Sequence, residues 1–154
     1  MKRIRAVSIT IRNDQILLMH RIKDGFEYYV FPGGGVEGSE TVEQAVVREL
    51  FEEATMKVKV GKLLYHHIYD DDTEQFFYLC EHVDGEPKLG NYNEAESMAA
   101  GNDLYEPIWY DISKINQLIL YPIEIRDWLI EDYKSGFINT PREATISVHD
   151  LREV

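Results

Sequence analysis

The sequence is poor in cysteine and contains no long hydrophobic run. Cys80 is the single cysteine among 154 residues, so the chain cannot form an internal disulfide, which fits a reducing compartment. No stretch reaches the roughly 18 apolar residues that a membrane span needs, and the strand-like N-terminus lacks the apolar block of a signal peptide. No internal repeat or low-complexity segment is visible. We therefore expect a cytoplasmic protein with no membrane partner.

Positive charge is also scarce. The chain has 16 Lys and Arg residues against 28 Asp and Glu residues, which gives a formal net charge of -12 at pH 7. Broad binding to nucleic acid or to an anionic membrane requires a basic surface, so this balance argues against both as partners. A small anionic substrate is compatible with the balance, provided that a metal cation stands between the two sets of negative charges.

The remaining composition is that of one folded domain. Hydrophobic residues make up 44% of the chain and aromatic residues 12%, and the length suffices for one core but not for two domains of ordinary size. Asn13 and Asp14 supply the turn chemistry of a hairpin near the N-terminus. Apolar and β-branched runs predict strands at residues 6–12, 15–21, 26–31, 58–69, 74–83 and 107–112. Many strands with few helices indicate an α+β fold with a mixed sheet between helices.

The first helix has a clear start signal. Thr41 and, three residues later, Gln44 form a capping-box pattern, so we expect a helix from Val42 to about Ala54. On a helical wheel its apolar residues share one side, which predicts the face toward the core. This expected face contains Val46, Val47, Leu50, Phe51 and Ala54.

A second helix is expected near the C-terminus. Pro122 suits the first residue of a helix and Gly136 suits its end. We assign residues 1–136 to the folded domain. Residues 137–154 show weak patterning and are expected to form a C-terminal tail of uncertain order.

Three carboxylates gather on the first helix. Glu49, Glu52 and Glu53 share one face because side chains three and four residues apart stack, and each like-charge pair costs about 0.2 to 0.5 kcal/mol. An isolated cluster of this kind is usually a solvated acidic face. Here a run of glycines precedes the helix, and the cluster lies late in the helix, where it opposes the macrodipole. A bound divalent cation would neutralise the cluster, and all-oxygen ligands favour Mg²⁺ or Mn²⁺ over Zn²⁺.

Arg48 lies within reach of the same carboxylates. It is four residues before Glu52 and eight after Glu40, so its guanidinium can hold a carboxylate by a bidentate contact and orient metal ligands. An ordinary surface arginine is the alternative interpretation.

The stretch from Gly34 to Met56 resembles the Nudix box, G-x5-E-x7-R-E-U-x-E-E-x-G-U, in which U is a bulky aliphatic residue. The matching positions are Gly34, Glu40, Arg48, Glu49, Leu50, Glu52, Glu53 and Met56. Thr55 stands where the family has glycine. Because a β-branched residue does not readily adopt the left-handed conformation, we expect a different exit from the helix, with the metal ligands kept in place.

The resemblance, to Nudix hydrolases of the MutT-like type, implies a fold and an activity. The fold is the α/β/α sandwich with a mixed β-sheet between helices. The activity is Mg²⁺-dependent hydrolysis of the pyrophosphate bond in a nucleoside diphosphate linked to another moiety, with Mn²⁺ as an alternative ion. Glu49 or Glu53 would activate the water, and Arg48 would support them. Dimers are common in the family, so a homodimer is one expectation.

The resemblance also implies binding residues. The implied metal ligands are Gly33 through its carbonyl, Glu49, Glu52, Glu53 and, from a long loop, Glu94 or its alternative Glu96. The residues expected near the substrate are Arg21, Gly34, Gly35 and Glu40. The physiological substrate stays open, because the subclass patterns of the family do not occur at their usual offsets. A Nudix-like module that binds a nucleotide without cleaving it is the alternative function.

Two competing interpretations carry less weight. Gly33, Gly35 and Gly38 spell G-x-G-x-x-G, as in a dinucleotide-binding fingerprint, but Glu37 and Glu40 would repel a pyrophosphate at that helix start. His66 and His67 are adjacent on an expected strand, so they point to opposite faces and do not predict a zinc site.

Overall fold

The computed structural model describes residues 2–88 and 103–148 of the chain. Within this part the strands are β1 (Arg3–Arg12), β2 (Gln15–Lys23), β3 (Phe26–Val30), β4 (Gly33–Gly35), β5 (Lys57–Tyr69), β6 (Thr73–Asp84), β7 (Leu104–Asp111), β8 (Leu120–Tyr121) and β9 (Arg142–Ile146). The helices are α1 (Val42–Ala54), the short 3-10 helix η1 (Ile112–Gln117) and α3 (Ile123–Ser135). None of the helices in these two ranges is long and apolar enough to cross a membrane.

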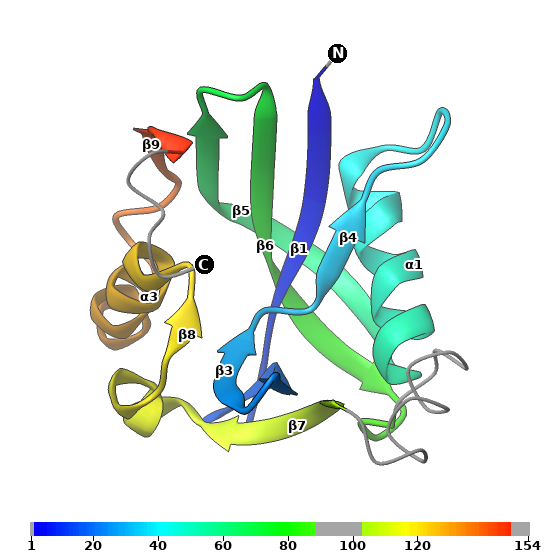
Figure 1. Ribbon diagram of the computed structural model, residues 1–154, viewed down its shortest axis with the longest axis vertical. Helices are drawn as coiled ribbons and strands as arrows, with labels where there is room; N and C mark the ends of the chain where they lie inside the picture. Colours follow the sequence, from blue (N-terminus) through cyan, green and yellow to red (C-terminus); the bar gives the residue numbers. More distant parts are fainter. Residues whose placement is uncertain (1, 89–102, 149–154) are drawn as a thin grey trace.

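The strands form one mixed sheet, in the order β8-β3-β2-β1-β6-β5-β9, with β4 added beside β1 and β7 beside β2. β1 runs antiparallel to β2 and parallel to β6. Helix α1 lies on one side of this sheet and α3 on the other (Figure 1). The expected α+β sandwich with a mixed sheet between helices is therefore confirmed.

The N-terminal hairpin forms where it was predicted. Asn13 and Asp14 both have positive φ values, 50° and 62°, as the turn between two twisted antiparallel strands requires. Ile11 pairs with Ile16 across this turn. The turn residues and the alternating pattern agree, so the register of β1 against β2 was readable from the sequence.

Helix α1 begins at the capping box that the sequence predicts. The Thr41 hydroxyl accepts a hydrogen bond from the Gln44 N–H at 3.1 Å, and the Gln44 side chain accepts one from the Thr41 N–H at 2.8 Å. The prediction of the core face is wrong for Val47 and Phe51, which are 42% and 55% exposed. The sheet covers only a narrow stripe of α1, and Ala45 lies inside that stripe instead.

The end of α1 also differs from the expectation. Thr55 adopts the left-handed conformation, with φ 55° and ψ 32°, although it is β-branched. Its backbone N–H donates to the Phe51 carbonyl at 3.0 Å, and its hydroxyl donates to the Ala54 carbonyl at 2.6 Å. These hydrogen bonds satisfy carbonyls that the helix end leaves without partners, which offsets the backbone strain.

Residues 137–148 of the C-terminal segment belong to the fold. Helix α3 starts at Ile123, one residue after Pro122, and ends before Gly136. Residues 137–148 differ from the expected tail, because strand β9 pairs in parallel with β5 and Phe137 is buried. Strand β9 can pair in parallel with β5 only after a long crossover connection. The short sequence of β9 does not show this distant pairing, so the sequence did not predict the strand.

The core lies in two layers, one on each face of the sheet. Leu50 and Met56 pack with Ala6 beneath α1. Phe77 and Leu129 belong to the layer beneath α3. Successive residues of β1 therefore point alternately toward the two layers, and this alternation fixes which β1 side chains can reach the site described next.

Candidate active site

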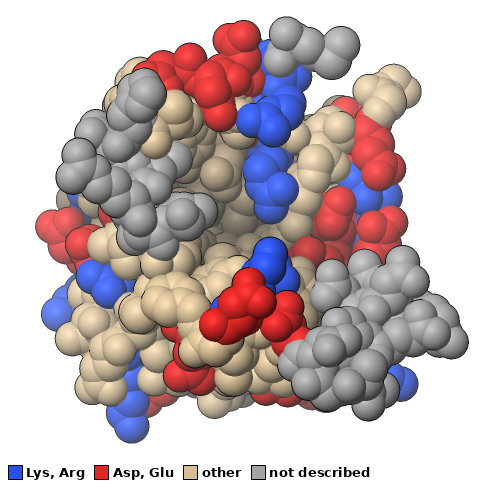
Figure 2. Space-filling model, in the orientation of Figure 1, with Lys and Arg blue, Asp and Glu red and all other residues tan. Residues whose placement is uncertain are grey.

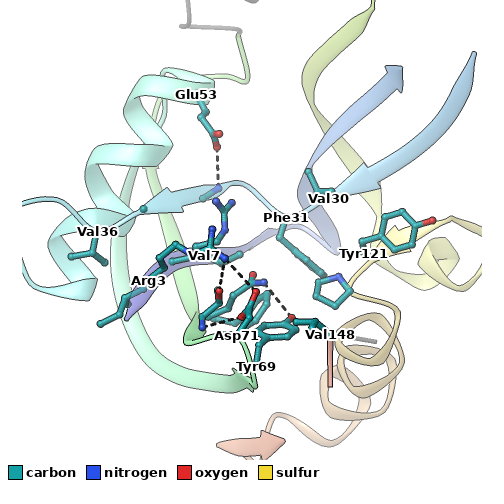
Figure 3. Close-up of a pocket in the computed structure, with 18 of the residues that line it drawn as sticks. Arg3, Val7, Val30, Phe31, Val36, Glu53, Tyr69, Asp71, Tyr121 and Val148 are labelled. Carbon is teal, nitrogen blue, oxygen red and sulfur yellow. Dashed lines mark hydrogen bonds and ion pairs between the residues drawn. The ribbon is translucent and has the colours of Figure 1, made fainter. Parts of the chain in front are cut away.

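A cleft of about 790 Å³ opens on the sheet face that α1 does not cover. Figure 3 shows Glu53 at one end of this cleft, Phe31 and Tyr121 along one side, and Asp71 at the far end. The described residues that line it come from strands β1 to β8 and from α1, with others in the connecting segments. Segments far apart in the sequence thus meet at one hollow.

The glycine strand β4 brings the helix against the sheet. Gly33 pairs with Val7 and Gly34 with Ala6 across the β1–β4 ladder. A Cβ on Gly33 would overlap the backbone of Ala6, and a Cβ on Gly34 would overlap the carboxylate of Glu49. A side chain at Gly33 would therefore push β1 and β4 apart, whereas a side chain at Gly34 would displace the carboxylate of Glu49.

Glu53 is the best-positioned carboxylate of the site. The Gly33 N–H donates to its Oε2 at 2.9 Å, and the Tyr105 hydroxyl donates to its Oε1 at 2.9 Å. Burial raises the pKa of Glu53 to about 7, although both hydrogen bonds oppose the shift. A carboxylate of this kind can bind or release a proton near neutral pH, which is the property of a general base or acid.

Arg48 joins the other two carboxylates of the helix. Its Nη1 lies 2.9 Å from Glu49 Oε1 and 3.1 Å from Glu52 Oε2. The pKa of Glu49 is raised by burial, while the contacts with Arg48 oppose the rise. In this structure the guanidinium supplies the positive charge that compensates the acidic cluster.

Glu40 in turn holds Arg48. Its carboxylate accepts from Arg48 Nη2 at 2.7 Å and from Arg48 Nε at 3.1 Å, and Arg48 Nη2 also donates to the Gly35 carbonyl at 2.8 Å. These contacts lower the pKa of Glu40. Glu40 is absent from the described residues that line the cleft, whereas Gly35 is among them. The geometry therefore makes Glu40 a support for Arg48, and it does not favour the expected contact with substrate.

The donor set of the helix fits a hard divalent cation. Glu49, Glu52 and Glu53 offer only carboxylate oxygens, and burial together with the charge of Glu49 raises the pKa of Glu53, a destabilisation that a cation would relieve. In residues 2–88 and 103–148, no three acidic, histidine or cysteine side chains are arranged to hold one ion. The predicted loop ligands Glu94 and Glu96 lie outside the described residues.

Arg21, which the sequence predicts to lie near the substrate, lines another wall of the cleft. Its guanidinium carbon lies 4.6 Å from the ring centre of Tyr105 and 6.0 Å from that of Tyr28. Its Nε is buried and has no hydrogen-bond partner in the described part of the chain. Sequence reasoning missed Tyr105, because only the pairing of Arg21 with Tyr105 across β2 and β7 brings this tyrosine to Glu53.

The adjacent histidines behave as predicted. His66 stacks on Phe76, with the ring centres 4.2 Å apart, while His67 meets Phe77 edge-on at 5.9 Å. Because Phe76 and Phe77 are themselves neighbours on β6, the two histidines face opposite sides of the sheet. They do not converge on one metal position.

Comparison with known proteins agrees with this geometry. The NUDIX domain family matches residues 2–129. The chain is 39% identical to an RNA pyrophosphohydrolase of Pasteurella multocida over 92% of this chain and 78% of that protein. It is 36% identical to the 8-oxo-dGTP diphosphatase of Escherichia coli over 66% of this chain and 86% of that one. It is 31% identical to the ADP-ribose pyrophosphatase of Methanocaldococcus jannaschii over 70% of this chain.

The match in length is partial for some relatives. The chain spans 60% of the archaeal ADP-ribose pyrophosphatase, and 41% and 29% of two further curated relatives.

Among solved structures, a NUDIX hydrolase from Nitrosomonas europaea superposes with a TM-score of 0.70 at 18% identity, covering 95% of this chain and 79% of that one. The match of the family model over residues 2–129 includes β4 and α1, and the chain is a member of the NUDIX domain family.

Proposed function

We propose that the protein is a Mg²⁺-dependent hydrolase that cleaves the pyrophosphate bond of a nucleoside diphosphate linked to another moiety. The observation that carries this proposal is Glu53, a half-buried carboxylate with a pKa of about 7 at the end of a cleft. The names of related proteins, which include pyrophosphatases and a diphosphatase, support the same reaction class. Mn²⁺ is the alternative ion.

The roles of the helix residues follow from their contacts. Glu53 would accept the proton of the attacking water, because its carboxylate is held at the end of the cleft by the Gly33 N–H and the Tyr105 hydroxyl. Glu49 would act beside it as a second carboxylate, held by Arg48 at 2.9 Å. When bound, the divalent ion would polarise the phosphate and lower the pKa of the water. Glu49, Glu52 and Glu53 are its proposed protein ligands, with the Gly33 carbonyl and Glu94 or Glu96 as further candidates.

The walls of the cleft suit an anionic substrate. Lys2, Arg3, Arg5 and Arg21 all line it, although the whole chain carries a net charge of -12. Figure 2 shows basic side chains along one edge of the hollow, over the N-terminal part of β1, with acidic residues spread over much of the surrounding surface. Such a local concentration of positive charge attracts a small phosphate-containing molecule without creating a surface for long nucleic acids.

A panel of substrates tests the proposal. We would measure phosphate release, through a coupled phosphatase, from nucleoside triphosphates, nucleotide sugars, ADP-ribose, dinucleoside polyphosphates and a short RNA with a 5′-triphosphate. Each reaction would be run with Mg²⁺, with Mn²⁺ and with chelator. We expect metal-dependent cleavage of one class of small nucleotide. Saturable binding without cleavage of any member would instead favour the non-catalytic binding module.

A further inference from the structure

Arg5 is an exposed cation of this cleft. It lies on β1 between Gly35 of β4 and Gln75 of β6 in the strand register, and it lines the cleft. Among the described residues its guanidinium makes no hydrogen bond and no ion pair, although its backbone is paired in the sheet. Its guanidinium is therefore available to a ligand that enters the cleft.

The neighbours of Arg5 on the same strand are paired with protein groups. Arg3 donates to the Thr73 hydroxyl at 3.0 Å and to the Asp71 carboxylate at 3.3 Å. Lys2 lies 2.8 Å from the carboxylate of Glu74. The charges of Arg3 and Lys2 are therefore partly neutralised, whereas the charge of Arg5 remains available.

Arg5 acts electrostatically on the two central carboxylates without pairing with either. Its positive charge lowers the pKa of both Glu49 and Glu53, opposing their burial. The hydrogen-bond partners of these carboxylates are other groups: Arg48 for Glu49, and the Gly33 N–H and the Tyr105 hydroxyl for Glu53. Arg5 is thus close enough to affect Glu49 and Glu53 electrostatically, but it forms no ion pair with either carboxylate.

We propose that Arg5 is a substrate-binding residue that holds the diphosphate group beside Glu49 and Glu53. A guanidinium presents two parallel N–H groups that match two phosphate oxygens, and its charge does not depend on pH in the physiological range. Arg5 lines the cleft from β1, whereas Arg21 lines it from β2. The inference rests on the proposed hydrolase function and adds to it the residue that aligns the scissile group.

Equilibrium binding tests the role without relying on turnover. Isothermal titration calorimetry would measure the dissociation constant of inorganic pyrophosphate for the wild type, Arg5→Gln, Arg5→Lys and Lys57→Gln. Lys57 is exposed at the start of β5 and loses the same single charge when it is replaced, so it controls for net charge. We expect Arg5→Gln to raise the dissociation constant by about 10-fold to 100-fold, which is typical for losing hydrogen bonds to a charged group.

The variants separate the possible outcomes. Arg5→Lys keeps the charge but not the paired N–H groups, so we expect a smaller loss than in Arg5→Gln. Equal weakening in Arg5→Gln and Lys57→Gln, or no binding of pyrophosphate to the wild type, would overturn the role of Arg5. Melting curves of all variants would confirm that each is folded.

Kinetics on any cleaved substrate of the panel completes the test. Arg5→Gln should raise KM by at least about 10-fold with a smaller change in kcat, because the contact is made before and during the reaction. Failure of the wild type to cleave any substrate would refute the hydrolase proposal, while the pyrophosphate titration would still decide whether Arg5 binds the anion.

Discussion

The three glycines of β4 should respond differently to the same substitution. An added Cβ meets the backbone of β1 at Gly33, the carboxylate end of Glu49 at Gly34, and nothing within 4 Å at Gly35. A backbone atom cannot move without disturbing the β1–β4 ladder, whereas the end of a flexible side chain can rotate away. The series therefore separates the stability of the fold from the arrangement of the site.

Gly33→Ala should destabilise the protein, and Gly34→Ala should mainly damage its activity. Forcing a methyl group into packed backbone costs about 1 to 3 kcal/mol, which for a domain of this size lowers Tm by about 3 to 10 °C. Displacement of the Glu49 carboxylate in Gly34→Ala should leave the free energy of unfolding within about 1 kcal/mol. It should reduce kcat by about 100-fold, as expected for a misplaced reacting group.

Differential scanning calorimetry and steady-state kinetics on the cleaved substrate would measure both effects. Gly35→Ala is the matched control for stability, and its Tm should equal that of the wild type. Wild-type melting of Gly33→Ala would refute the close approach of β4 to β1. Wild-type turnover of a folded Gly34→Ala would show that the position of the Glu49 carboxylate does not matter for the reaction.

Further predictions concern the carboxylates, the C-terminal strand and pH. Glu53→Gln should lower kcat by at least about 100-fold with no loss in Tm, and a fully active variant would assign the base elsewhere. Mg²⁺ at ten times its dissociation constant should stabilise the protein by about 1.4 kcal/mol in thermal melts, whereas a Tm indifferent to the ion would speak against the site. Arg142→Ala removes a 2.6 Å ion pair from the buried Asp132 and should cost about 3 kcal/mol in urea denaturation. Burial lowers the pKa of His67 to about 4 from 6.5, so the unfolded chain binds a proton first as the pH falls through this range, and folding stability decreases. Because Glu124 lies 3.0 Å from His67 Nε2 and would favour the protonated ring, we expect a loss of about 2 kcal/mol between pH 7 and 4 that is absent in His67→Gln.

The sequence predicted most reliably those features that depend on neighbouring residues. The capping box at Thr41 and the turn at Asn13 and Asp14 depend on contacts within a few residues, and the structure has both. The exposed positions Val47 and Phe51 were misjudged, because a helical wheel shows which residues share a side but not how much of that side a sheet will cover. The left-handed Thr55 was misjudged for a related reason, since neighbouring carbonyls supplied hydrogen bonds that offset its strain.

The sequence by itself determined the family, the fold class and the cluster of acidic residues on one helix face, because periodicity and motif spacing are properties of the chain alone. The tertiary structure decided which groups surround that cluster. Tyr105 reaches Glu53 only through the pairing of β2 with β7, and Arg5 faces the cleft only because β1 lies between β4 and β6. Burial also decided the raised pKa of Glu53, since desolvation depends on what the folded chain packs around a carboxylate and not on its neighbours in sequence.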